Sequence, residues 1–250
     1  MRHSAGLPYL TLLIFVVLVL IQRNVEDWQE DVSQQVMAET SQTLLQDLSD
    51  PFETRDFPRV YPFACPNISQ SLLPDLWTMV CVNDPQFNDI AREIFVNGAW
   101  ESWLSDHLVK AMINYPEAVL LDIGSNIGPH SLTVAAMERE VVVLDAVYYN
   151  LALISMSHKM TNKGKVKILY NSISDKEGEE LYPYLEAQHS HMAGATYLVT
   201  REQLDTANYK WEEVIGPPAV SVTTRDIFDD IKASTIVIKI DVEGHECKVS

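Results

Sequence analysis

The sequence predicts an α/β fold with a doubly wound parallel sheet, on the strength of two observations. Four short runs are aliphatic almost throughout, as strands are when helices cover both faces of a sheet; these runs are Ala118–Ile123, Val141–Leu144, Val166–Leu169 and Ile236–Ile240. Helix-compatible segments, Ser131–Met137 and Leu151–Met160, join the first three runs and are long enough for right-handed crossovers. We therefore expect strands and helices to alternate through the body of the protein.

The composition narrows the classes of partner. The 250 residues include 18 Lys and Arg against 35 Asp and Glu, a formal net charge of −17, and 47 % are hydrophobic. Such a chain is neither disordered nor collagen-like, and its length suits one large domain or two small ones. Nucleic acid and anionic lipid surfaces are bound through clustered Lys and Arg, so this charge excludes them as main partners.

Residues 1–23 are expected to form a cytosolic tip and a signal-anchor transmembrane helix. From Ser4 to Gln22 no side chain carries a full charge, and about 19 helical residues reach roughly 28 Å, close to the hydrocarbon core of about 30 Å. A cleaved signal peptide is the alternative, but Gln22 and Arg23 are not the small residues of a cleavage site. Arg2 favours a type II protein with its body in the lumen of the Golgi or endoplasmic reticulum.

Residues 24–60 are expected to form an acidic stem. They hold nine acidic and two basic side chains. Apolar residues recur there at helical spacing, at Val25, Trp28, Val32 and Val36. Pro51 interrupts the pattern, which indicates a short amphipathic helix followed by a linker. A coiled-coil dimer is the alternative, but the pattern lacks three clean heptads.

Two features suit a lumenal body. Asn67-Ile68-Ser69 is an N-glycosylation sequon. Cys65 and Cys81, with fifteen residues between them, would close a loop that stabilises the fold by roughly 3 kcal/mol in an oxidising compartment. Two buried free thiols are the alternative.

The body covers residues 61–250 and carries further elements around the four aliphatic runs. Two helices are expected ahead of the first strand, over Gln86–Phe95 and Trp100–Ile113. Between the third and fourth runs we expect a hairpin or flap, a short strand and a helix capped by Thr224; these cover Glu179–Tyr184 with Ala195–Thr200, then Ala219–Val222, then Asp226–Ile231.

The residues that carry chemistry gather at strand ends. After the first strand the chain reads Asp122-Ile-Gly124-Ser125-Asn126-Ile-Gly128. Gly and Asn tolerate positive φ, so we expect a tight turn at which backbone approaches a ligand. The spacing matches neither the Gly-x-Gly-x-x-Gly of dinucleotide folds nor the Gly-Lys-Ser/Thr of phosphate loops. Asp122 would repel a pyrophosphate but attract an ammonium or sulfonium group, and S-adenosylmethionine has both.

Asp145 ends the second strand about twenty residues after the glycine turn. An acidic side chain at that position can accept hydrogen bonds from both hydroxyls of a ribose. An isolated Asp at a strand end is more often a cap or a solvated charge, but its distance from the glycine turn favours the ribose role.

Three segments together resemble the FkbM family of class I S-adenosylmethionine-dependent methyltransferases; they are Asp122–Gly128, Asn171–Asp175 and Ile238–Glu246. Gly98-Ala-Trp-Glu101 also resembles the animal members of the family. The likeness covers roughly residues 80–250, and the segment Lys-Ile-Asp-Val-Glu-Gly-His-Glu is its most distinctive part. The chain departs from the family pattern at Asp145-Ala146, where Glu-Pro is usual.

The resemblance implies a Rossmann-like class I methyltransferase sheet and assigns roles to its strand ends. The turn residues Gly124, Ser125, Asn126 and Gly128 would cradle the methionine moiety, and Asp145 would bind the ribose. Ser172 and Asp175 would lie near the adenine. Asp241 would face the methionine end and the mouth through which the acceptor enters.

Methyl transfer to a hydroxyl requires alignment of the two reactants and removal of one proton. Asp241, Glu243 and His245 are the candidate acceptors of that proton, and the choice among them stays open. Capping or packing roles are the alternatives for Glu243 and His245. His189 and His191 invite a metal interpretation, but no third ligand stands at a telling spacing, so no metal is expected.

Class I methyltransferases normally have seven strands, whereas Ser250 follows the fourth run by ten residues. We therefore expect the sequence to be a fragment that stops after its fourth strand, with that strand exposed at an edge. The expected function is S-adenosylmethionine-dependent O-methylation of a glycan or other hydroxylated small molecule in the secretory pathway. A catalytically inactive binding module of the same fold is the alternative, and an NAD-linked oxidoreductase ranks last.

Overall fold

A computed structural model describes residues 17–22, 45–46, 63–83, 89–186, 196–206 and 208–242. Its main sheet has five strands in the order β1 (Val17–Gln22), β13 (Thr235–Ile240), β6 (Val119–Ile123), β7 (Glu140–Asp145) and β8 (Lys165–Tyr170). The last four of these are mutually parallel, and β1 runs antiparallel to β13. All four aliphatic runs are therefore strands of one sheet, and the predicted α/β fold with a parallel sheet is confirmed.

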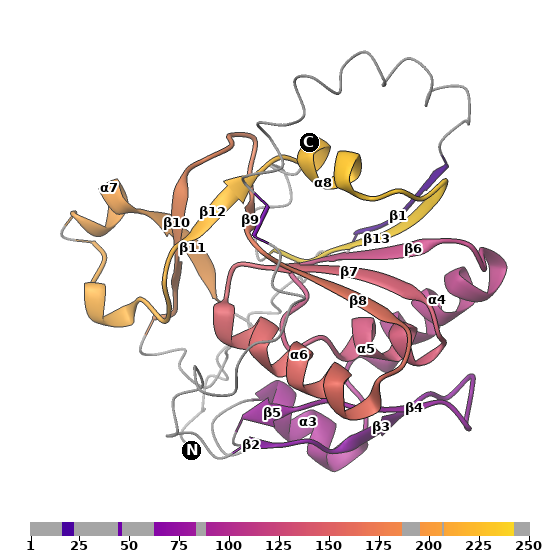
Figure 1. The fold of residues 1–250 in the computed structure, drawn as a ribbon. Coiled ribbons are helices and arrows are strands. Elements are labelled where there is room, and N and C mark those ends of the chain that lie inside the picture. Colours follow the sequence, from indigo (N-terminus) through magenta and orange to yellow (C-terminus); the bar gives the residue numbers. More distant parts are fainter. Residues whose placement is uncertain are drawn as a thin grey trace, which may run out of the picture.

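Helices cover both faces of this sheet (Figure 1). Three lie on one face, α4 (Ser102–Asn114), α5 (Pro129–Ala136) and α6 (Tyr148–Thr161), and α8 (Thr224–Asp230) lies on the other. Successive side chains of β6 point to opposite faces of the sheet, because side chains alternate along a strand. Leu120 joins the cluster under α5 and α6, whereas Leu121 joins the cluster that includes Ile227 of α8. This two-sided burial explains why the strands read as continuous aliphatic runs.

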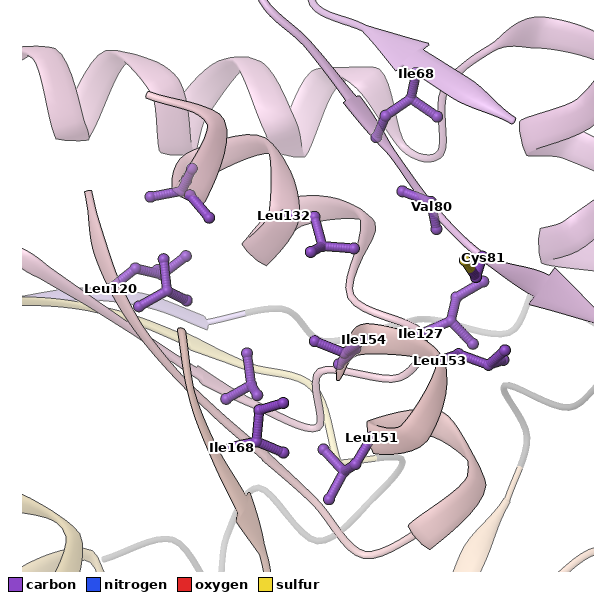
Figure 2. Close-up of a cluster of buried hydrophobic side chains, with 14 of the residues drawn as sticks. Ile68, Val80, Cys81, Leu120, Ile127, Leu132, Leu151, Leu153, Ile154 and Ile168 are labelled. Carbon is purple, nitrogen blue, oxygen red and sulfur yellow. The ribbon is translucent and has the colours of Figure 1, made fainter. Parts of the chain in front are cut away.

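A third layer packs outside α5 and α6. It contains two small antiparallel sheets and a helix, made of β2 (Phe63–Ala64) with β5 (Val82–Asn83), β3 (Asn67–Ser69) with β4 (Trp77–Met79), and α3 (Asp89–Asn97). Figure 2 shows Ile68 and Val80 of this layer in the same hydrophobic cluster as Leu132 of α5, Ile154 of α6 and Leu120 of the sheet. The layer thus completes the main core.

Cys65 and Cys81 form a disulfide in this outer layer. The sequence left a disulfide and two free thiols as alternatives, and the structure favours the disulfide. The backbone N–H of Cys81 also donates to Ser157 Oγ of α6 at 2.7 Å. Asn67 of the sequon is exposed on β3.

A second sheet stands at the carboxyl ends of the main strands. Its order is β11 (Tyr197–Thr200), β10 (Glu180–Tyr184), β12 (Ala219–Val222) and β9 (Ser172–Ile173). β10 and β11 are the predicted hairpin, since they pair antiparallel. Two short helical segments, α7 (Arg201–Leu204) and η4 (Trp211–Glu213), connect β11 to β12.

The sequence predicted Thr224 as the cap of the helix α8, and this prediction is wrong, because Thr223 caps it. Thr223 Oγ1 accepts from the N–H of Asp226, and the Asp226 carboxylate accepts from the N–H of Thr223. This reciprocal pair satisfies two backbone donors at the helix start. Two adjacent threonines read alike in a sequence, and only the backbone conformation decides which of them precedes the helix.

Val17–Gln22 form strand β1 beside β13, whereas a transmembrane helix was expected over these six residues. A short aliphatic run suits a buried strand as well as a helix, and here β1 pairs with the side of β13 that faces away from β6. The expectation that the fourth strand lies exposed at an edge is therefore wrong, because β13 is paired on both sides. The rest of the predicted span, residues 4–16, lies outside the described residues. Within the described part of the chain, no helix is long and apolar enough to cross a membrane.

Of the predicted stem, residues 24–60, the structure describes only Leu45 and Gln46. Leu45 packs against the apolar cluster under α8, and the carbonyl of Gln46 accepts from the N–H of Tyr170 in β8 at 2.9 Å. This part of the stem therefore contacts the body directly. The predicted amphipathic helix lies outside the described residues.

Candidate functional site

The candidate site lies at the carboxyl ends of the parallel strands. The chain leaves β6 toward β7, while β13 lies on the other side of β6, so the strand order reverses between β6 and β13. Crevices at such a switch point are the usual ligand sites of open α/β sheets. A cleft opens there, lined by Gly124, Asn126, Leu144, Asp145, Ala146, Val147, Asn150, Asn171, Ser172, Ile173, Thr196, Leu198, Asp241 and Val242. Five residues predicted from the sequence meet in it: Gly124, Asn126, Asp145, Ser172 and Asp241.

Gly124 is required by the close approach of two strand ends. Its φ is 73°, and a Cβ at this position would lie 1.8 Å from the carbonyl oxygen of Asp241. Its N–H donates to the carbonyl of Leu144 in β7 at 2.8 Å, and the N–H of Asp241 donates to Ile123 at 3.0 Å. Because glycine has no side chain, the ends of β6 and β13 can approach each other closely beside β7, where the cleft begins.

Gly128 serves helix packing. It precedes α5 with a φ of 76°, and a Cβ there would lie 2.7 Å from Cγ1 of Ile154 in α6. It is not among the residues that line the cleft. The second glycine of the turn thus sets the distance between α5 and α6, whereas Asn126, with a φ of 51°, faces the cleft.

Asp145 ties the glycine turn to the end of β7. Its carboxylate accepts from the N–H of Asn126 at 2.7 Å and from the N–H of Val147 at 2.8 Å, with Asn150 Nδ2 at 3.3 Å. Burial raises the pKa of this carboxyl to about 6, and the two backbone N–H groups offset part of the rise. Each carboxylate oxygen has two lone pairs, so acceptor capacity remains for a ligand in the cleft.

Asp122 does not line the cleft, and a lysine of the same chain balances the charge of its carboxylate. Its side chain is fully buried, Lys239 Nζ donates to Oδ1 at 2.9 Å, and Ser131 Oγ donates to Oδ2 at 2.6 Å. Burial alone would lower the pKa of Lys239, but the carboxylates of Asp122 and Asp241 outweigh burial and hold that pKa above its ordinary value. The predicted role of Asp122 as direct partner of a cationic ligand is therefore not what this geometry offers.

Asp241 follows β13 and is one of the residues that line the cleft. Its carboxylate lies 3.8 Å from Lys239 Nζ. Burial raises the pKa of its carboxyl; Lys239 opposes the rise, and the charges of Asp122 and Glu101 add to it.

A second group of polar side chains lies where α4 and α5 meet, and none of its members lines the cleft. His130 is buried, with Nδ1 2.8 Å from Ser105 Oγ and Nε2 3.5 Å from Glu101 Oε2. Both Glu101 and His130 contribute to the electrostatic environment of Asp241. Neither residue was predicted from the sequence as a site residue. The signal for Glu101 was its place in the Gly-Ala-Trp-Glu segment, and for His130 its position directly after the glycine turn.

Three further residues were predicted as cofactor contacts, namely Ser172, Asp175 and Ser125, and of these only Ser172 lines the cleft. Ser172 is buried, whereas Asp175 is exposed and accepts from Ser174 Oγ. Ser125 is buried, and within the described part of the chain its Oγ has no hydrogen-bond partner.

Glu243, His245, His189 and His191 lie outside the described residues. Among the described residues, no group of His, Cys, Asp and Glu has the arrangement of a metal site.

No protein-family model and no curated protein matches the chain. Two solved structures of phosphoethanolamine N-methyltransferase 2 from Haemonchus contortus align with it. The one in complex with phosphomonomethylethanolamine and S-adenosylhomocysteine is 12 % identical with a TM-score of 0.23, and the alignment covers 76 % of this chain and 59 % of that one. The one in complex with S-adenosyl-L-methionine is 11 % identical with a TM-score of 0.21, and covers 75 % and 59 %. The chain thus spans less than two thirds of either protein, and likeness at these TM-scores carries no argument about its fold or function.

Proposed function

We propose that this protein is an S-adenosylmethionine-dependent methyltransferase of the class I, Rossmann-like type and a member of the FkbM family. The observation that carries the proposal is the meeting of Gly124, Asp145, Ser172 and Asp241 in one cleft at the switch point of the sheet. Asp145 ends β7, whereas Gly124, Ser172 and Asp241 follow β6, β8 and β13 closely, so residues from four strands of the parallel sheet support the proposal.

The lining has the chemistry that a sulfonium nucleoside needs. The Asp145 carboxylate offers acceptors for ribose hydroxyls, and Leu144, Ile173 and Leu198 offer apolar contact for a base. Asp241 adds negative charge for an ammonium or sulfonium group. When bound, S-adenosylmethionine would supply an electrophilic methyl group; the residues of the chain would bind it, align the acceptor and receive a proton.

Transfer to a hydroxyl of a glycan or another small molecule in the secretory pathway is the finer form of the proposal. Two features support a lumenal body: the disulfide between Cys65 and Cys81, which requires an oxidising compartment, and the exposed Asn67 of the sequon. Membrane attachment through residues 1–23 as a type II anchor belongs to the same proposal. Insertion of that segment would require β1 to leave β13, since Val17–Gln22 cannot be strand and membrane helix at once.

Calorimetry with S-adenosylhomocysteine tests the core of the proposal. We expect micromolar binding by the wild type and at least tenfold weaker binding by Asp145→Asn, while Asp175→Asn, at the exposed position outside the cleft, binds like the wild type. Binding of NADH in place of the nucleoside would contradict the proposal. Binding of S-adenosylhomocysteine without labelled methyl transfer to a glycan extract would instead support the inactive binding module.

A further inference from the structure

A second cavity, of about 330 Å³, lies where the outer layer meets the helices α4 and α5. Its walls come from β3 and the turn after it, from the connection between α3 and α4, and from the N-terminal halves of α4 and α5. Among the described residues, none lines both this cavity and the cleft at the strand ends. Its volume falls within the range of small-molecule sites, about 300–1,000 Å³.

The lining of this cavity is polar but uncharged. Thirteen described residues line it; seven of them are Ser, Thr, Asn or Gln, and none is Asp, Glu, Lys or Arg, although 21 % of the chain is charged. Phosphates, carboxylates and ammonium groups are usually bound through charge-assisted hydrogen bonds, which such a lining does not supply. The cavity therefore suits an uncharged ligand with many hydrogen-bonding groups.

Gln70 presents a buried donor to the cavity. The residue lines the cavity and is 6 % exposed, and its Oε1 accepts from the N–H of Ser71 at 3.0 Å. This bond fixes which end of the amide is the oxygen. Within the described part of the chain the amide nitrogen has no hydrogen-bond partner. A buried donor left unpaired costs about 1–3 kcal/mol, so a ligand oxygen that accepts from Gln70 would be stabilised.

Two further lining residues present acceptors whose orientation is fixed by other bonds. Asn97 Nδ2 donates to Glu93, which leaves the side-chain carbonyl of Asn97 as an acceptor. Thr133 is buried and donates its hydroxyl proton to the carbonyl of Pro129 at 2.8 Å, so its oxygen can still accept. Trp100, half-buried against the main core, adds an aromatic surface. This combination matches a sugar, whose hydroxyls donate and accept and whose C–H groups are apolar.

We propose that this cavity is a binding site for an uncharged saccharide. The Gln70 amide donates to a sugar oxygen, and the oxygens of Asn97 and Thr133 accept from sugar hydroxyls. The ring of Trp100 packs against the C–H groups of the sugar. The inference does not rest on the proposed methyltransferase function, because the two sites have separate linings.

The saccharide has two conceivable sources. One is the glycan that the sequon would place on Asn67, which is exposed on β3 two residues before Ser69 of the lining. Two residues of a strand span about 7 Å, and a tethered sugar has a high effective concentration, so weak contacts would suffice. The other source is a free glycan in solution.

Titration of Asn67→Gln, which carries no glycan at this position, tests the site. We expect this variant to bind glucose, galactose, mannose or N-acetylglucosamine with a millimolar dissociation constant, measured by protein-observed NMR. Glucuronic acid and glucosamine, which are charged, should bind at least about tenfold more weakly. The inference is wrong if none of the four neutral sugars binds, or if the charged sugars bind equally well.

Two substitutions added to Asn67→Gln locate the binding. Ser102→Phe places a ring in the cavity from an exposed lining position, and Gln70→Glu keeps the acceptor for Ser71 but removes the donor. We expect each to weaken sugar binding at least about tenfold. Ser234→Phe and Gln203→Glu, at exposed positions outside the cavity, are the matched controls and should bind like the parent. Unchanged binding by both cavity variants would overturn the inference.

Wild-type protein with a glycan on Asn67, verified by mass spectrometry, distinguishes the two sources. If it does not bind the added sugar that Asn67→Gln binds, the chain's own glycan occupies the cavity. If both bind the sugar equally, the cavity takes a free saccharide. Calorimetry with S-adenosylhomocysteine decides the proposed function separately, and a negative result there leaves the saccharide site standing.

Discussion

Lys239 Nζ lies 2.9 Å from Asp122 Oδ1, and the two side chains are only 2 % and 0 % exposed. The lysine also donates to the carbonyl of Gly124 at 3.1 Å. This buried pair joins β13 to β6 directly beneath the cleft, at the pairing Lys239–Asp122 of the strand register. Asp122, which the sequence predicted as a partner of a cationic ligand, is thus paired with Lys239 of the same chain.

Removing the lysine should destabilise the protein strongly, because a buried carboxylate would lose its partner. We expect Lys239→Met to lower the free energy of unfolding by about 3–5 kcal/mol, measured by urea denaturation. Lys167→Met is the control: its ion pair with Asp230, at 2.7 Å, is partly exposed and should contribute about 1 kcal/mol or less. Equal effects of the two substitutions would contradict this account of the buried pair.

Gly124→Ala should be far more damaging than Gly178→Ala. Both glycines have positive φ, 73° and 78°, so both substitutions pay a strain of about 1–2 kcal/mol. Only at Gly124 would the new Cβ meet backbone, the Asp241 carbonyl at 1.8 Å, while Gly178 has no atom within 4 Å. Overpacking adds about 1–3 kcal/mol at Gly124. Thermal unfolding of the two variants measures the difference, and similar melting temperatures would refute the close approach of β6 and β13.

Nucleoside binding should weaken as pH falls through about 6. Burial raises the pKa of the Asp145 carboxyl to about 6, so the carboxylate that would accept ribose hydroxyls is formed above that pH and protonated below it. We expect the calorimetric affinity for S-adenosylhomocysteine to fall between pH 7 and pH 5. Asp145→Asn should bind weakly with a flatter pH dependence in this window; an equally steep dependence in the variant would assign it to another group.

The same carboxyl affects folding stability with a defined sign. Its pKa is higher in the folded state than the ordinary value of 3.8, so the folded protein binds the proton more tightly. Its contribution to stability is therefore complete below about pH 4 and is lost as pH rises through about 6. Chemical denaturation at pH 5 and pH 7 should show a smaller loss of stability over this interval in Asp145→Asn than in the wild type.

The start of α8 offers a comparison between adjacent threonines. Thr223→Ala removes the capping acceptor for the Asp226 N–H, and we expect a loss of about 1 kcal/mol in the free energy of unfolding. Thr224 Oγ1 is buried and has no hydrogen-bond partner in the described part of the chain, so Thr224→Ala should cost less. A larger loss for Thr224→Ala in urea denaturation would show that the helix begins one residue later.

The sequence by itself determined the parallel sheet and much of the cleft. Aliphatic runs that alternate with helix-compatible segments favour parallel strands covered on both faces, and the carboxyl ends of parallel strands meet at one edge of the sheet. The sequence therefore predicts that Gly124, Asp145 and Asp241 lie near one another, as they do in the cleft. Glycines at positive φ also leave a local signal, since few other residues fit there.

The tertiary structure decided which partner each group has. Lys239 follows Asp122 by 117 positions in the sequence. Glu101 lies near His130 only because α4 packs on α5. No local sequence pattern predicts either pair. The sequence could not decide the conformation of Val17–Gln22, because an aliphatic run fits a helix or a strand. Pairing with β13, more than 200 residues further along the chain, makes it a strand. Local residues fix conformation through their own sterics, whereas a buried charge takes whichever partner the packing of distant segments brings within hydrogen-bond distance.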